Sequence, residues 1–92
     1  MTLEHAKAIV DKELRRSGYS FVFRESKSTN SCYYKIEGSQ DTSLMFRISD
    51  HNTNKNVLSF LVTEHQSEAQ LVNFVDNRIR DFKKRHLKAL LG

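Results

Sequence analysis

Six polar side chains are spaced so that two neighbouring strands would bring them onto one surface. They are Ser31, Tyr33, Arg47, Ser49, Asp50 and His51. The segments at residues 32–36 and 44–49 both alternate apolar and polar residues, which is the pattern of half-buried β-strands. Serine, aspartate and histidine supply hydrogen bonds or acid–base chemistry, whereas arginine and tyrosine suit phosphate contacts and base stacking. The spacing therefore predicts a polar surface across a β-hairpin.

Two carboxylate–histidine pairs, Asp50-His51 and Glu64-His65, are the candidates for metal binding or general acid–base catalysis. Neighbouring residues of a strand point to opposite faces, so each pair converges only where it lies in a turn. The sequence has no metal-ligand spacing and no glycine-rich phosphate loop, and its single cysteine, Cys32, excludes a cysteine-based zinc cluster. We therefore predict a protein that is not an enzyme, binds no metal or cofactor and has no small-molecule substrate.

The Ser49-Asp50-His51 motif also has a purely structural interpretation. Serine and aspartate side chains commonly hydrogen-bond to nearby backbone at the point where a strand ends and a loop begins. Tyr33 and Arg47 would likewise form a structural pair across the strand ladder. The sequence leaves open whether the motif builds the fold or contacts a partner.

The positive charge of the chain is concentrated near its C-terminal end. Residues 1–75 hold as many acidic as basic side chains, so the formal net charge of +4 lies entirely in residues 76–92. The cations of that segment are Arg78, Arg80, Lys83, Lys84, Arg85 and Lys88. This placement suits a polyanion such as nucleic acid, or an acidic protein groove. The alternative is structural, because the helix macrodipole favours basic residues near a helix C-terminus.

Composition predicts one domain, residues 1–92, in a cytoplasmic compartment. The 92 residues are 38% apolar and include six Phe and three Tyr, which is enough for a core without disulfides. No linker rich in proline or glycine divides the chain. The N-terminus lacks the layout of a secretory signal, and no apolar run approaches the ~20 residues of a membrane span. We therefore expect no membrane partner.

Two amphipathic helices are predicted, one near each end of the chain. The first places Leu3, Ala6, Val10 and Leu14 on one stripe. Thr2 is its expected N-cap and Gly18 its expected C-terminal stop. The second begins at a capping-box pattern in residues 67–70. Its apolar stripe comprises Leu71, Phe74, Val75, Ile79 and Phe82, with Leu87, Leu90 and Leu91 as an extension.

Four strands with period-two alternation are predicted between these helices. They lie at about residues 19–24, 32–36, 44–49 and 57–63, separated by polar turns at residues 26–30, 38–41 and 52–56. The predicted fold class is α+β with the order α-β-β-β-β-α. We expect an antiparallel four-stranded sheet with both helices on one face, because this packing buries one sheet face and both helical stripes.

That packing would leave the second face of the sheet uncovered. Its residues would be Ser20, Val22, Arg24, Tyr33, Lys35, Met45, Arg47, Ser49, Ser59 and Leu61. A face that mixes aromatic and basic residues fits phosphate contacts and base stacking, and it also fits a protein interface. A sheet face that is simply solvated is the third interpretation.

From Ser31 onward the chain resembles small phage-encoded proteins, among them an anti-CRISPR inhibitor of Cas9 from a streptococcal phage. The shared features are Ser31-x-Tyr33 and the strand end Phe46-Arg47-Ile48-Ser49-Asp50-His51, followed by an aliphatic strand and a helix containing Asn73-Phe74-Val75-Asp76. The likeness spans just over half of the chain. It implies a phage or prophage origin and action in the cytoplasm of an infected or lysogenic bacterial host.

The resemblance implies an anti-CRISPR protein that binds a CRISPR effector of the Cas9 type, or its guide RNA complex, without catalysis. The expected contact residues are Tyr33, Lys35, Arg47, Ser49, Asp50, His51, Arg78, Arg80, Lys83, Lys84, Arg85 and Lys88. The first alternative is a nucleic-acid-binding module laid out like a double-stranded-RNA-binding domain. A small RNA-cleaving toxin that uses His51 is another. Homodimerisation through the sheet edge or through the three C-terminal leucines is a further expectation.

Overall fold

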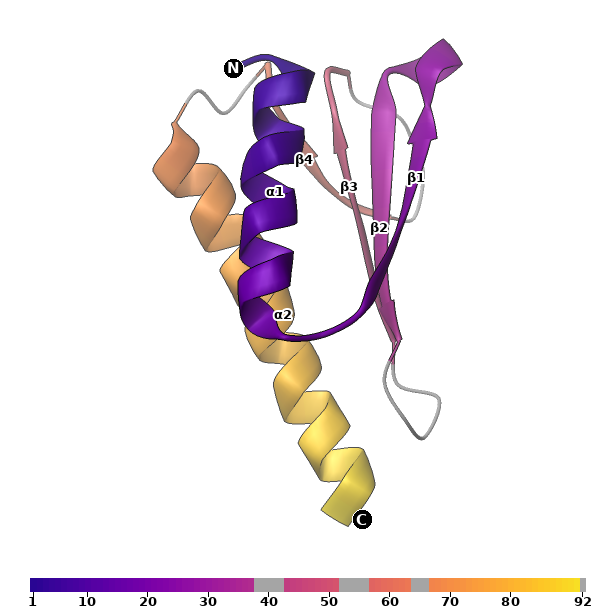
Figure 1. The fold of residues 1–92 in the computed structure, drawn as a ribbon, viewed down its shortest axis with the longest axis vertical. Helices are drawn as coiled ribbons and strands as arrows, with labels where there is room; N and C mark the ends of the chain where they lie inside the picture. Colours follow the sequence, from indigo (N-terminus) through magenta and orange to yellow (C-terminus); the bar gives the residue numbers. More distant parts are fainter. Residues whose placement is uncertain (38–42, 52–56, 64–66, 92) are drawn as a thin grey trace.

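The computed structural model describes residues 1–37, 43–51, 57–63 and 67–91 as two helices packed on one face of a four-stranded sheet (Figure 1). The elements are α1 (Leu3–Ser17), β1 (Phe21–Ser26), the short 3₁₀ helix η1 (Lys27–Thr29), β2 (Ser31–Glu37), β3 (Ser43–Ser49), β4 (Leu58–Leu61) and α2 (Glu68–Leu91). The predicted α+β class and the order α-β-β-β-β-α are confirmed. The turns expected at residues 38–41 and 52–56, and the pair Glu64-His65, lie outside the described residues.

The sheet is mixed, so the prediction of a fully antiparallel sheet is wrong at its last strand. The strand order is β1-β2-β3-β4, and β1–β2 and β2–β3 are antiparallel. Strand β4 runs parallel to β3, with Phe46 opposite Leu58 and Ser49 opposite Leu61. The alternating pattern of β4 indicates which residues are buried but carries no information on strand direction. The prediction assumed a hairpin where the chain makes a crossover.

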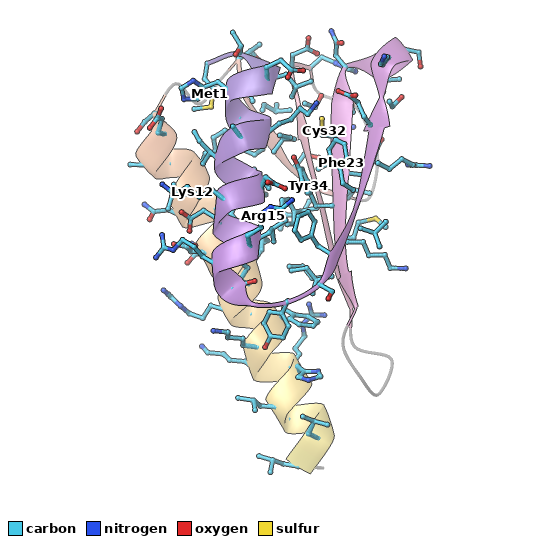
Figure 2. All side chains as sticks on the ribbon, in the orientation of Figure 1. Met1, Lys12, Arg15, Phe23, Cys32 and Tyr34 are labelled. Carbon is cyan, nitrogen blue, oxygen red and sulfur yellow. The ribbon has the colours of Figure 1, made fainter. Side chains whose placement is uncertain are left out.

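Alternating strand residues and the two helical stripes form one core between the sheet and the helices. Its central members are Ala6, Val10, Leu14, Tyr34, Ile36, Phe46, Ile48, Phe60, Leu71, Val75 and Phe82. The Tyr34 and Phe46 rings stack at 5.3 Å between centroids, and Figure 2 shows Tyr34 in the layer between α1 and the sheet. Burial of each large apolar side chain contributes about 1.5–3 kcal/mol. This core fixes which face each strand turns to solvent.

Both helices begin where the sequence signals place them. The backbone N–H of His5 donates to Thr2 Oγ1 at 3.1 Å, and Gly18 ends α1 in the left-handed conformation with φ +80°. At the start of α2, Ser67 accepts a hydrogen bond from the backbone N–H of Ala69 at 3.1 Å, and the Gln70 side chain accepts one from the backbone N–H of Ser67. The predicted capping pattern is therefore confirmed.

The two helices run in the same direction, and α2 is much the longer. Both start at the same end of the molecule, where the side chains of His5 and Glu68 are hydrogen-bonded to each other. Helix α2 has 24 residues against 15 in α1, and its C-terminal turns extend past the sheet (Figure 1). The apolar residues of those turns, Leu87, Leu90 and Leu91, are exposed rather than part of the core. In the ranges that the structure describes, no helix is long and apolar enough to cross a membrane.

Candidate functional site

The β2–β3 ladder places the predicted polar residues directly beside one another. Ser31 lies opposite Ser49 and Tyr33 lies opposite Arg47, as the sequence spacing predicted. We refer to these four residues as the polar cluster. The outer strands extend the pair Tyr33–Arg47 into a row, because Arg24 of β1 lies opposite Tyr33 and Ser59 of β4 lies opposite Arg47. The row thus crosses all four strands.

The polar cluster is buried, which corrects the expectation that this part of the sheet face is uncovered. Arg47 is 1% exposed, Ser31 and Ser49 are 0% exposed, and Tyr33 is 9% exposed. The uncovered face was inferred from the packing of both helices on the opposite face, and that packing alone does not determine the burial of each residue.

Hydrogen bonding and stacking hold the cluster in place. The Arg47 Nε–H donates to Ser59 Oγ at 3.0 Å, and the Ser59 hydroxyl donates to the Val57 carbonyl at 3.0 Å. The guanidinium of Arg24 lies 4.8 Å from the centroid of the Tyr33 ring, so Arg24 is a cation that stacks on this tyrosine. A buried charged group is tolerated where hydrogen bonds satisfy it. Because Arg47 lies on β3 and Ser59 on β4, their hydrogen bond joins the two strands.

The Ser49-Asp50-His51 motif forms a hydrogen-bonded turn at the end of β3. Ser49 Oγ donates to the His51 carbonyl at 2.7 Å and accepts from the His51 backbone N–H at 3.1 Å. The Asp50 carboxylate contacts His51 Nδ1 at 2.8 Å and accepts a hydrogen bond from the Asn30 side chain at 2.9 Å. These bonds lower the pKa of Asp50, the His51 contact being the larger cause. The geometry thus supports the structural interpretation of the motif.

The same geometry argues against nucleophilic catalysis at this turn. The Ser49 hydroxyl is buried and bonded to backbone, so it is not placed to attack a substrate. Cys32 is also fully buried, and burial raises the pKa of its thiol to about 11, which leaves it protonated at neutral pH. Within the described ranges, no three His, Cys, Asp or Glu side chains are close enough to hold a metal ion.

Helix α2 presents the exposed cations of the predicted site. Arg80, Lys83, Lys84, Arg85 and Lys88 are all exposed, and we call these five residues the basic surface of α2. Figure 2 shows side chains of the last turns of α2 pointing outward on several sides. Arg80, Lys84 and Lys88 follow one another at a spacing of four residues, which aligns them along one line of the helix. The basic surface is therefore open to a large partner.

The remaining predicted contact residues occupy intermediate positions. Arg78 is half-buried, lies 5.4 Å from the Phe74 ring centroid and pairs with Asp81 at 3.4 Å. Lys35 is half-buried, opposite Met45 on β3 and Val22 on β1. Met45 and Val22 are exposed, so this end of the second sheet face is open, unlike the end that carries the polar cluster.

Sequence analysis missed one cation that the fold brings to α2. Arg16 of α1 lines the same groove as Arg80 and Lys83, together with Glu13, Ser17, Asp76 and Ile79. The only sequence signal for Arg16 was its place in the last turn of α1, which the helix macrodipole explains equally well. Its position beside α2 follows from the parallel packing of the helices, which periodicity does not specify.

A scan against protein-family models, a search of curated proteins and a search of solved structures each found no match to this chain.

Proposed function

We propose that this protein is a non-catalytic anti-CRISPR protein that binds a Cas9-type effector, with the guide RNA as the partner of the basic surface of α2. One observation carries the contact: α2 presents a cluster of exposed cations to solvent, and its last turns extend beyond the sheet (Figure 1). The cations are Arg80, Lys83, Lys84, Arg85 and Lys88. The choice of effector rests on the sequence resemblance around Ser31-x-Tyr33 and residues 46–51. The protein would act in the cytoplasm of the infected or lysogenic bacterial host.

Electrostatics favours RNA over the nucleic-acid channel of the effector. Such channels are positively charged because they hold the guide–target heteroduplex, so a basic helix is repelled from an empty channel. Guide RNA offers one negative charge per nucleotide, and each neutralised phosphate releases counterions. Five phosphate contacts on single-stranded RNA would give a logarithmic salt slope of about −3.5.

The turn at the end of β3 supports a binding role without chemistry. Ser49 is buried, and the Asp50 and His51 side chains are bonded to each other. The hydrogen bond from Asn30 to Asp50 joins the residue before β2 to the residue after β3, so it stabilises this end of the strand pair. We therefore propose that the sheet supports α2 and that α2 makes the main contact.

The test is a pull-down of the purified protein against Cas9 alone, Cas9 with guide RNA, and guide RNA alone, at a low and a high salt concentration. Retention by the guide-loaded complex is expected, and it should be weaker at the high salt concentration. Binding to bare RNA only, lost at high salt, would overturn the anti-CRISPR proposal. Capture by Cas9 without RNA would place the contact on protein and overturn the assignment to guide RNA.

A matched pair of variants identifies the contributing surface in the same experiment. The first is the helix variant, Lys83→Gln/Lys84→Gln/Arg85→Gln, which removes three positive charges from α2. The control variant, Arg15→Gln/Arg24→Gln/Lys27→Gln, removes three exposed charges from α1, β1 and η1. Only the helix variant is expected to lose retention. Equal losses would show that net charge, rather than the basic surface of α2, governs binding.

A general RNA-binding module is the second candidate, favoured by one feature of the fold. The antiparallel strands β1, β2 and β3 carry both helices on one face, as in a double-stranded-RNA-binding domain, but β4 adds a fourth, parallel strand before α2. However, the first turns of α2, residues 68–76, contain no basic residue. Strong binding to bare double-stranded RNA in the absence of any effector would favour this candidate.

A further inference from the structure

An open groove of about 270 Å³ lies between the last turns of α1 and the middle of α2. Its lining consists of Glu13, Arg16, Ser17, Asp76, Ile79, Arg80 and Lys83. Three cations thus come together from two helices that are distant in the sequence. The groove also lies beside the basic surface of α2, because Arg80 and Lys83 belong to both.

Arg16 is held over this groove by a buried carboxylate. Its Nη1 lies 3.2 Å from Glu13 Oε1, and the Glu13 side chain is 9% exposed whereas that of Arg16 is 69% exposed. A guanidinium has five N–H donors in a fixed plane, so one contact to Glu13 orients the group and leaves donors for a second anion. Glu13 therefore positions Arg16 at the rim of the groove.

The other two cations are not neutralised locally. Arg80 and Lys83 are exposed and form no ion pair with any residue in the described part of the chain. Asp76 and Glu13 are the carboxylates of the lining, and Glu13 is already paired with Arg16. The lining therefore carries one more positive than negative charge, and a phosphate with its several acceptor oxygens matches cations that line one groove.

Arg15 provides the natural contrast to Arg16. It precedes Arg16 in the same helix, is similarly exposed at 72%, and pairs at 2.7 Å with Asp11, which is itself 45% exposed. However, Arg15 lines a different groove, together with Tyr19, Phe21 and Phe23. The two arginines therefore differ in the groove that they line and in the burial of their carboxylate partners.

We propose that Arg16, Arg80 and Lys83 together hold one backbone phosphate of the bound RNA, so that the RNA contact extends from α2 onto α1. This inference rests on the proposed function, because it assumes an RNA partner for the basic surface of α2. It adds a residue of α1 to that contact and assigns Glu13 a positioning role. The phosphate accepts from the Arg16 guanidinium on one side and from the α2 cations on the other.

Two double variants test the groove without changing net charge. Glu13→Gln/Arg16→Gln removes the groove pair, and Asp11→Asn/Arg15→Gln removes the matched pair on the other side of α1. Affinity for guide-loaded Cas9 and for guide RNA alone is measured by fluorescence anisotropy over a salt series. We expect the groove variant to bind about fivefold more weakly at ~0.1 M salt, with a slope smaller by about 0.7, because one phosphate contact is lost. The matched variant is expected to bind as the wild type does.

The outcomes separate this inference from the proposed function. Equal binding by the two double variants, with binding lost in the helix variant, would overturn the groove and leave the proposed function standing. Wild-type binding to free guide RNA but not to guide-loaded Cas9, weakened by the groove variant, would support the groove and overturn the effector proposal. Failure of the wild type to bind either target would overturn both. Circular dichroism melts of both doubles confirm that the comparison is made on folded proteins.

Discussion

The polar cluster of β2 and β3 and the basic surface of α2 contain similar residue types in opposite environments. Arg47 in the cluster is 1% exposed and bonded to Ser59, whereas Arg80, Lys83 and Lys84 on α2 are exposed. A buried guanidinium has lost its hydration and must be satisfied by the protein itself. An exposed one keeps its donors for a partner. Burial, rather than residue type, therefore separates residues that build this fold from residues that can bind.

The Ser49-Asp50-His51 motif belongs with the residues that build the fold. Sequence alone allowed a ligand contact or a structural turn, and the hydrogen bonds of Ser49, Asp50 and His51 are directed to one another and to Asn30. These bonds join the start of β2 to the end of β3. The three residues of this motif, which carry part of the resemblance to phage proteins, therefore build the fold.

Replacing Arg47 should produce the largest loss of stability. Arg47→Ala leaves a cavity in the cluster and removes the partner of Ser59, so we expect a loss of about 3 kcal/mol in the free energy of unfolding. For a domain of this size that loss lowers Tm by more than about 10 °C. Urea and thermal unfolding measure it, with exposed Lys27→Ala as the control. Wild-type stability together with lost partner binding would show that Arg47 is a contact residue.

The helix variant should show the opposite behaviour. Lys83→Gln/Lys84→Gln/Arg85→Gln is expected to leave Tm nearly unchanged, since all three side chains are exposed. Binding to the guide-loaded effector should weaken about 100-fold at ~0.1 M salt if each charge meets one phosphate. Paired thermal melts and salt-dependent anisotropy measure the two effects. A large fall in Tm would place these residues among the structural ones and would remove the contrast between the two regions.

The sequence predicted those features of the fold that depend on local signals. The apolar stripe from Leu3 to Leu14 and the capping box at Ser67 located both helices, and period-two alternation gave the faces of the strands and the pairing of Tyr33 with Arg47. Strand direction has no local signal, because a strand shows the same alternation whichever way it runs. The parallel β4 was therefore missed.

The limits of the site prediction follow from the same cause. The buried state of Arg47 depends on what lies over the strand, which only the tertiary path of the chain determines. The approach of Arg16 to Arg80 depends on the parallel packing of two helices that are more than fifty residues apart in the sequence. By contrast, the cations of α2 were found from sequence because a dense cluster on a helix is exposed in almost any packing.

The turn at the end of β3 should show its structural role through the pH dependence of stability. Hydrogen bonds from His51 and Asn30 lower the pKa of Asp50 below its usual 3.8, so the folded state favours the ionised carboxylate. The contribution of Asp50 is then fully present above that usual value and is lost as the pH falls through the lowered pKa. Asp50→Asn should lower Tm at neutral pH, and the difference should close on acidification. Asp81→Asn is the control, and a pH-independent difference would contradict the assignment.

The smallest expected effect lies at the boundary between the two regions, at Arg24. This side chain is exposed like the α2 cations, yet its guanidinium stacks on Tyr33 of the polar cluster at 4.8 Å. Arg24→Gln should cost about 0.5 kcal/mol through the lost cation–π contact. Its affinity for the guide-loaded effector should match that of Lys27→Gln, which removes an equal charge nearby. Chemical denaturation measures the stability of both variants, and anisotropy measures their affinity for the guide-loaded effector. Weaker binding by Arg24→Gln alone would extend the contact surface to the sheet and bring the polar cluster into the partner interface.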